Sequence, residues 1–209
     1  MTRKKLVVSG DSWTAGSVKQ RAGIVLWPDL LAEKLNMECV NVAKGGRGNE
    51  VIYNNIIDTL CTTKNIGLSI CMWSSVDRWD FFEKSFEIQP QFFVDQTTML
   101  ERGIRWFHAF QNHCVVNGIP FLQIQSVPFN RSIAKELIDS PQLNHIDESN
   151  FIGWPIYSEL GGSTVCDKLN KADPEMKKLR VSDEDTHPNT DGHKLMAELL
   201  YEHYRKLYV

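Results

Sequence analysis

A serine near the start of the chain and a histidine near its end have the side-chain types and settings that nucleophilic catalysis needs. Ser12 directly follows an apolar run, in the stretch VVSGDSWTAGS over residues 7–17, and His187 stands in DTHPNTDGH over residues 185–193. A serine hydroxyl is a weak nucleophile until a neighbouring base takes its proton, and a neutral imidazole can serve as that base. We therefore expect Ser12 to act as a nucleophile and His187 as its general base.

Backbone N–H groups beside Ser12 would stabilise the negative charge that develops during such an attack. Ser12 falls where a helix is expected to begin, so N–H groups there point toward the attacked atom and the helix dipole favours an anion. Gly46, in KGGRGN over residues 44–49, lets the backbone approach the same point because glycine has no side chain. An acidic neighbour would hold the His187 tautomer and stabilise the imidazolium.

The elements that must position these residues follow from the hydrophobic pattern. Short apolar runs predict strands over residues 4–9, 38–43, 66–73 and 120–127. Helical spacing predicts helices over residues 26–35, 49–60, 93–118 and 190–209. Strands that alternate with helices indicate a parallel sheet of about five strands covered on both faces, an α/β/α sandwich. On the last helix the side chains expected to be buried are those of Leu195, Met196, Leu199, Leu200 and Leu207.

This topology would bring distant residues to one edge of the sheet. Sites in parallel sheets form beyond the carboxyl ends of the strands. Ser12 follows the first predicted strand, Gly45 and Gly46 the second and Ser74 the third, while His187 precedes the last helix. We expect these positions to converge.

Residues 127–182 interrupt the alternation and are predicted to form an irregular insertion or cover within a single domain over residues 1–209. Within it, Trp154 and Tyr157 either cover a cleft or pack the segment onto the body. The aromatic stretch 79–93 is either loop and partial core or a wall for an apolar or sugar-like substrate. Arg78 is either a surface ion-pair partner or a ligand for an anionic part of the substrate.

Three motifs resemble the blocks of the GDSL/SGNH hydrolase family, in that family's chain order. They are GDSW at residues 10–13, NVAKGGRGN at 41–49 and DTHPNTDGH at 185–193. The resemblance implies a flavodoxin-like fold and hydrolysis of carboxylic esters, often acyl or acetyl groups on lipids or sugars, without a cofactor or metal. By motif, Ser12 corresponds to the nucleophile and first oxyanion donor, Gly46 to the second donor and His187 to the base. The overall pattern resembles divergent members in phage and environmental sequences.

The third block departs from the family's pattern. It usually reads Gly-x-Asn-Asp, and its asparagine donates to the oxyanion, whereas this chain has CMWSSVDRW at residues 71–79. Ser74 or Ser75 stands in place of the asparagine, and a hydroxyl can also donate a hydrogen bond, with a shorter reach. Asn49 is an alternative source of the missing amide.

The acidic partner of His187 departs as well. The family's Asp-x-x-His spacing would select Glu184, whereas Asp185 lies two residues before His187. We favour Asp185 because aspartate is the usual residue, but either carboxylate could reach the imidazole.

The same residues allow other interpretations. Ser12 could simply cap a helix, or its loop could hold a phosphate, which would leave His187 without a role. His187 and His193 with nearby carboxylates could bind a metal, but their spacing of six residues need not put them on one face, and we expect no metal and a structural contact for His193. The alternative functions are a binding or structural module without efficient chemistry and an O-acyltransferase that uses the same residues.

The bulk composition excludes several classes of protein. The chain has 209 residues, 42% of them hydrophobic, and a net charge of −3, which gives no signal for binding nucleic acid. No apolar run is long enough for a signal peptide or a membrane span, so we expect a cytoplasmic or phage-associated protein. The five cysteines show no C-x-x-C pairing and are expected in the core. The expected partner is a small-molecule or carbohydrate ester, and the oligomeric state is left open.

Overall fold

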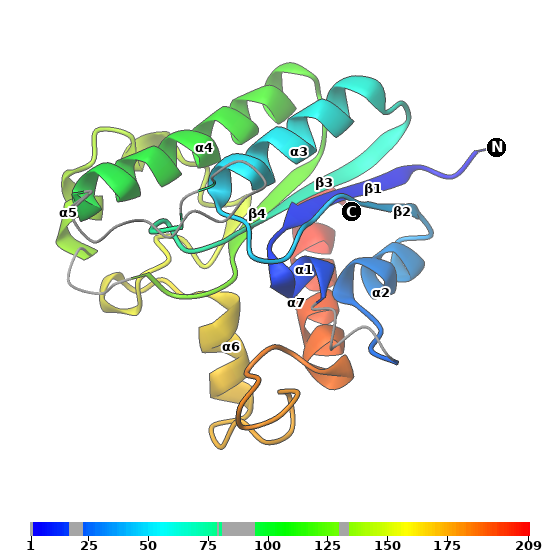
Figure 1. The fold of residues 1–209 in the computed structure, drawn as a ribbon. Coiled ribbons are helices and arrows are strands. Elements are labelled where there is room, and N and C mark those ends of the chain that lie inside the picture. Colours follow the sequence, from blue (N-terminus) through cyan, green and yellow to red (C-terminus); the bar gives the residue numbers. More distant parts are fainter. Residues whose placement is uncertain (1, 17–22, 79, 81–94, 130–133) are drawn as a thin grey trace.

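The protein folds around a parallel sheet, as the sequence predicts. The structure is a computed structural model that describes residues 2–16, 23–78, 80, 95–129 and 134–209. Within these residues five strands pair in parallel in the order β2-β1-β3-β4-β5 (Figure 1). Their bounds are β1 Lys5–Gly10, β2 Glu38–Asn41, β3 Ile66–Trp73, β4 Phe121–Gln125 and β5 Phe151–Ile152.

Helices cover both faces of the sheet and complete a three-layer fold (Figure 1). α2 (Trp27–Lys34) and α7 (Thr190–Tyr208) pack on one face, and α3 (Asn49–Thr62) and α4 (Gln96–Val116) on the other. Alternate residues of β3 serve the two cores: Ile70 and Met72 face α2 and α7, whereas Cys71 and Trp73 face α3 and α4. Because both faces are buried, β1 and β3 are mostly apolar in sequence, whereas β4 alternates apolar residues with Gln123 and Gln125 and the edge strand β2 is only partly buried.

The remaining short helices lie near the carboxyl ends of the strands. They are α1 (Ser12–Ala15), α5 (Ala134–Asp139) and α6 (Val165–Ala172), with single 3-10 turns at Leu143–His145 and Ser158–Leu160. In Figure 1, α6 lies below the sheet and to the left of α7. This end of the sheet therefore carries most of the irregular chain.

Two expectations about burial were wrong. On α7 the buried stripe runs through His193, Met196, Ala197 and Leu200, whereas Leu195 and Leu207 are each 37% exposed. Leu195 lies beside the 3.6-residue stripe rather than on it, and Leu207 falls in the last turn, beyond the main contact with the sheet. Cys61, also expected in the core, is exposed on α3.

The segment 127–182 is more regular than its sequence indicates. It supplies β5, the edge strand of the sheet, together with α5 and α6. β5 has only two residues, which is too few for a period-two pattern to be recognised. Tyr157 is buried against Phe129 with ring centroids 5.8 Å apart, and Trp154 packs on Phe151 at 5.0 Å. All four rings lie within the segment, and Phe129, Phe151 and Tyr157 belong to the same core cluster as Trp73 and Phe107, so the segment packs onto the body. The stretch 79–93 lies outside the described residues except for Asp80.

An aromatic cluster in the larger core yields a stability prediction. Phe107 of α4 is fully buried between Trp73 and Phe151, with ring centroids 4.9 and 5.3 Å away. Phe107→Ala is expected to lower the free energy of unfolding by about 3–5 kcal/mol, because it removes buried apolar surface and leaves a cavity. Val116→Ala, at the exposed end of the same helix, is expected to change it by less than about 0.5 kcal/mol. Urea unfolding of the two variants measures both values, and a loss below about 1 kcal/mol for Phe107→Ala would contradict this description of the core.

Candidate active site

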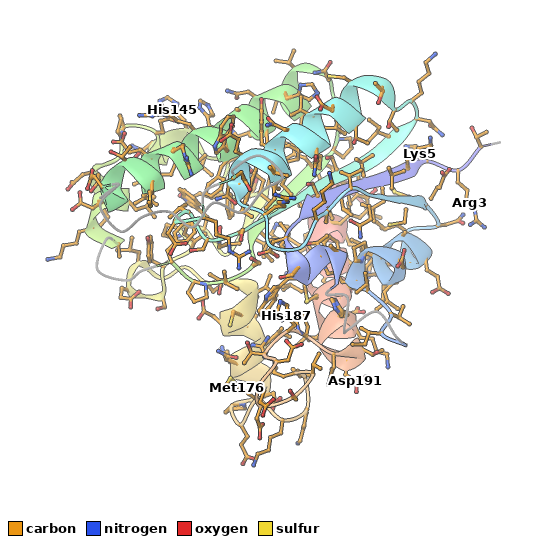
Figure 2. The ribbon with its side chains drawn as sticks, viewed as in Figure 1. Arg3, Lys5, His145, Met176, His187 and Asp191 are labelled. Carbon is orange, nitrogen blue, oxygen red and sulfur yellow. The ribbon has the colours of Figure 1, made fainter. Side chains whose placement is uncertain are left out.

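Three side chains from opposite ends of the chain form a continuous hydrogen-bonded row. The Ser12 Oγ lies 2.8 Å from Nε2 of His187, 175 residues away in the sequence. Nδ1 of His187 lies 2.6 Å from Oδ1 of Asp185. Because a carboxylate can only accept, Nδ1 carries the proton and Nε2 of a neutral imidazole is free to accept from Ser12. Figure 2 shows His187 close to α1, the helix that begins with Ser12.

A tight loop sets the orientation of His187. The N–H of Val181 donates to the carbonyl of His187 at 2.9 Å, and the N–H of Ser182 donates to the carbonyl of Asp185 at 3.1 Å. The side chain of Asp185 also accepts from the N–H of His187 at 3.2 Å. Glu184 is exposed on the outside of this loop. Of the two acids that the sequence left open, the structure therefore places Asp185 at the imidazole.

The carboxylate of Asp11 lies beneath Ser12 and is fully buried. Its Oδ1 accepts from the N–H of Trp13 at 3.0 Å, which caps the single turn of α1. Its Oδ2 accepts from the hydroxyls of Ser74 at 2.8 Å and Ser126 at 3.1 Å, and Nη1 of Arg78 lies 3.4 Å away. Asp11 thus joins the ends of β1, β3 and β4, a role that sequence reasoning missed although an Asp before a helix signals an N-cap.

The serine in the third block is directed toward Asp11. The hydroxyl of Ser74 donates to that carboxylate, and its backbone N–H donates to Oδ1 of Asn49 at 2.8 Å. Nδ2 of Asn49 is buried without a hydrogen-bond partner among the described residues and lies 3.8 Å from the position that a β-carbon on Gly103 would take. The amide of Asn49 therefore faces α4. Among the described residues, neither the Ser74 hydroxyl nor the Asn49 amide donates a hydrogen bond at Ser12.

The glycine turn after β2 lies against the nucleophile candidate. A β-carbon at Gly45 would lie 3.8 Å from Cβ of Ser12, whereas one at Gly46 would have nothing within 4 Å. Gly46 has a φ of 74°, a left-handed conformation that favours glycine, so it forms the turn that presents Gly45. Within the described part of the chain, the N–H groups of Ser12, Gly45 and Gly46 donate to no other group. Because α1 has only four residues, any stabilisation of an anion would come from these individual N–H groups rather than from a helix dipole.

His193 is a buried neighbour of the row. Its Nδ1 accepts from the N–H of Trp27 at 3.3 Å, which links α7 to the start of α2. Burial, with a smaller contribution from the charge of His187, lowers the pKa of His193 to about 4, so the ring is neutral at pH 7. The described residues contain no group of three or more His, Cys, Asp or Glu side chains arranged to hold a metal ion. His193 thus makes a structural contact near the N-terminus of α7, as expected from the sequence, and its partner is the first residue of α2.

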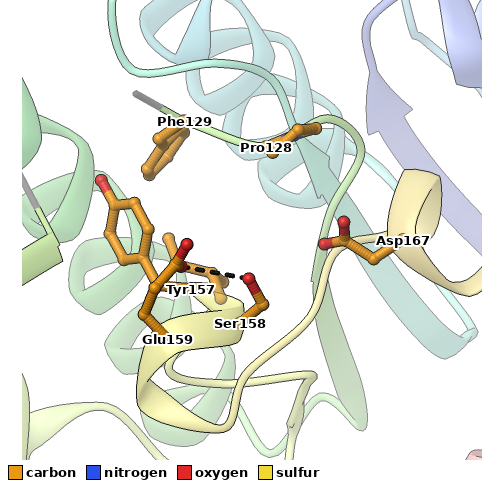
Figure 3. Close-up of a pocket in the computed structure, with 7 residues that line it drawn as sticks. Pro128, Phe129, Tyr157, Ser158, Glu159 and Asp167 are labelled. Atoms are coloured by element: carbon orange, nitrogen blue, oxygen red, sulfur yellow. Dashed lines mark hydrogen bonds between the residues drawn. The ribbon is translucent and has the colours of Figure 1, made fainter. Parts of the chain in front are cut away.

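A small cavity lies in the segment 127–182. Its walls come from Pro128, Phe129, Ile156, Tyr157, Ser158, Glu159 and Asp167 (Figure 3). Its volume of about 10 Å³ suits a single water molecule, so it is too small for a substrate. The hydroxyl of Ser158 donates to Glu159 at 3.1 Å beside it (Figure 3).

Comparisons with known proteins agree on the fold. No family model and no curated protein matches the sequence. Among solved structures, a putative lipolytic protein of the G-D-S-L family from Desulfitobacterium hafniense DCB-2 is 17% identical, with a TM-score of 0.58 over 96% of this chain and 99% of that one. Esterase EstA from Pseudoalteromonas sp. is 11% identical, with a TM-score of 0.55 over 97% of both chains.

A carbohydrate esterase described as having divergent catalytic and non-catalytic binding functions is 13% identical, with a TM-score of 0.54; the match covers all of this chain and 66% of that one. The protein therefore has the fold of the GDSL/SGNH hydrolases and carbohydrate esterases, as its motifs led us to expect. Among the described helices, none is long and apolar enough to cross a membrane.

The lowered pKa of His193 predicts how stability depends on pH. The unfolded chain binds a proton at this histidine below about pH 6.5, whereas the folded protein binds it only near pH 4, so acid favours unfolding in that interval. Between pH 7 and pH 4.5 the wild type is expected to lose about 2 kcal/mol more unfolding free energy than His193→Asn, which keeps an acceptor for Trp27 but cannot titrate. Urea unfolding at the two pH values measures the difference, and equal losses in the two proteins would show that His193 does not titrate as described.

Proposed function

We propose that the protein is a serine hydrolase that cleaves carboxylic esters and is a divergent member of the GDSL/SGNH family. The single observation that carries this proposal is the row Ser12–His187–Asp185, with its two contacts of 2.8 and 2.6 Å at the carboxyl edge of the sheet. A row of this kind gives a hydroxyl nucleophile a general base and gives the base an orienting acid. The fold shared with lipolytic and carbohydrate esterases supports the same proposal.

In the proposed reaction, Ser12 attacks the ester carbonyl carbon while His187 takes its proton. The N–H groups of Ser12 and of the Gly45–Gly46 turn bind the oxyanion, with Gly46 as the donor assigned by motif. The protonated imidazole, held by Asp185, then donates to the leaving alcohol. In the second half, His187 takes a proton from water, the hydroxide attacks the acyl-enzyme, and Ser12 recovers its proton as the acid leaves.

For the substrate we propose a small ester or an acyl group on a carbohydrate. The matches to carbohydrate esterases support the second class, one of them a family two carbohydrate esterase from Cellvibrio japonicus. The Arg78 side chain is 36% exposed and, among the described residues, contacts Asp11 at 3.4 Å, so we propose that it also binds an anionic part of the substrate. We also propose that the segment 127–182 belongs to the same domain and borders the site.

One observation supports a second candidate, a binding module on the same fold. Ser74 donates to Asp11 and Asn49 faces α4, so the described residues supply no side-chain replacement for the amide that the family places in the oxyanion hole. Loss of one such donor can cost about a hundredfold or more in rate. The N–H groups of Ser12, Gly45 and Gly46, which donate to no group within the described ranges, and the row Ser12–His187–Asp185 favour the hydrolase.

Removal of the nucleophile or the base tests the proposal directly. Ser12→Ala and His187→Ala are each expected to abolish hydrolysis of p-nitrophenyl acetate, because attack requires both groups. A fluorophosphonate should label the wild type at Ser12 and leave Ser12→Ala unlabelled. A wild type that is folded but neither turns over nor is labelled would favour the binding module, and labelling that persists in Ser12→Ala would identify a different nucleophile. Acyl transfer to added sugar in preference to water would identify an acyltransferase.

The two acids beside His187 offer a matched pair of substitutions. Asp185→Asn is expected to lower kcat at least tenfold, because the amide can no longer stabilise the imidazolium. Glu184→Gln is expected to change kcat less than about twofold, since Glu184 is exposed on the outer side of the loop. Steady-state kinetics on p-nitrophenyl acetate compares them. If neither substitution slows the reaction, the site works as a serine–histidine pair, and if only Glu184→Gln does, the acid has been misassigned.

A further inference from the structure

Arg180 is a buried cation that the proposed reaction does not use. Arg180 directly precedes the loop over residues 181–187 that carries His187, and it is only 3% exposed. Nη2 donates to Oδ1 of Asn170 on α6 at 2.6 Å. No acceptor in the described ranges lies within hydrogen-bonding distance of Nε or Nη1. Burying donors without partners is costly, so a favourable contact of another kind must offset the cost.

That contact is the indole ring of Trp13. The guanidinium carbon of Arg180 lies 5.1 Å from the ring centroid, which is a cation–π distance, and indole is the strongest partner for such a contact. Trp13 is itself only 5% exposed and directly follows Ser12 in α1. Its ring centroid lies 6.3 Å from that of His187. The Arg180 side chain therefore packs against α1, the turn that contains Ser12.

The backbone of Arg180 holds the other half of the site. Arg180 forms an isolated antiparallel bridge with Pro188, the residue after His187. Its carbonyl accepts from Nδ2 of Asn189 at 2.9 Å, and the next N–H, that of Val181, donates to the carbonyl of His187. Arg180 thus forms the base of the loop that carries the imidazole.

We infer that Arg180 is a positioning residue that sets the separation of Ser12 from His187. Its side chain fixes α1 through Trp13, its backbone fixes the loop of His187, and Asn170 holds the plane of the guanidinium. The inference rests on the proposed function, in which proton transfer depends on the 2.8 Å contact between the two side chains. Among the described residues no hydrogen bond joins Arg180 to either side chain, so it acts through its neighbours.

The test is Arg180→Met, which keeps an unbranched apolar stem but removes the guanidinium. We expect kcat for p-nitrophenyl acetate to fall about 10- to 100-fold with little change in KM, because small displacements of reacting groups slow the chemical step more than they weaken binding. Rates are expressed per serine labelled by a fluorophosphonate, so that a smaller folded fraction does not count as slower chemistry. Arg180→Lys, which keeps the charge without the planar fork, should give an intermediate kcat.

Arg205→Met is the matched control. Arg205 also lies over an aromatic ring, that of Tyr201 at 5.8 Å, but in the last turns of α7. Its removal is expected to leave kcat unchanged. Trp13→Phe, alone and combined with Arg180→Met, tests the path: the two effects on kcat should be less than additive, since each removes the same contact.

Several outcomes would overturn the inference. An unchanged kcat per labelled serine in Arg180→Met would overturn it, even if the variant melts at a lower temperature. Additive effects of Trp13→Phe and Arg180→Met on kcat would show that Trp13 does not carry the coupling. A wild type without turnover would instead count against the proposed function. In that case the low-field proton NMR signal of the N–H between His187 and Asp185, assigned by its loss in His187→Ala, gives a separate readout. Arg180→Met should shift or broaden this signal and Arg205→Met should not; equal spectra would overturn the inference.

Discussion

The buried carboxylate of Asp11 is the interaction on which this end of the structure depends. A carboxylate without partners is very costly to bury, so the chain must surround it with donors. These come from Ser74 and Arg78 after β3 and from Ser126 after β4, in addition to the N–H of Trp13 in α1. The residues that follow β3 and β4 therefore contact the carboxylate that follows β1. Ser12 is the next residue in the chain, so the demand for donors around Asp11 also fixes where the nucleophile candidate stands.

The same interaction explains the unusual third block. The hydroxyl of Ser74 donates to the Asp11 carboxylate, which links the end of β3 to the end of β1, and it does not donate at Ser12. Asn49 adds a second link by accepting from the N–H of Ser74, which connects the first residue of α3 to the end of β3. The charge on a tetrahedral intermediate would then rest on backbone N–H groups of Ser12 and the turn at Gly45. Such donors are held by the main chain and need no rearrangement during the reaction.

The histidine side of the site depends on the docking of α7. His193, Met196 and Leu200 bury one stripe of this helix against α2 and the sheet, and the contact from His193 to Trp27 fixes its start. The loop of His187 enters α7 through Asn189, whose side chain accepts from two N–H groups of the first turn. The position of the imidazole therefore follows from core packing as well as from its own hydrogen bonds.

The sequence by itself determined the main elements, because their apolar periodicities are local and each spans several residues. It also indicated that Ser12 and His187 meet, because Ser12 follows the first strand at the carboxyl edge of the sheet and the motif that contains His187 stands just before the last helix, as in the GDSL/SGNH family. Only the tertiary structure decided which acid faces the imidazole, because one turn of a loop exchanges Glu184 for Asp185. Only the tertiary structure decided that the Ser74 hydroxyl points to Asp11, that β5 forms and that Arg180 lies over the ring of Trp13. These features depend on contacts between residues far apart in the chain, and such contacts leave no local pattern in the sequence.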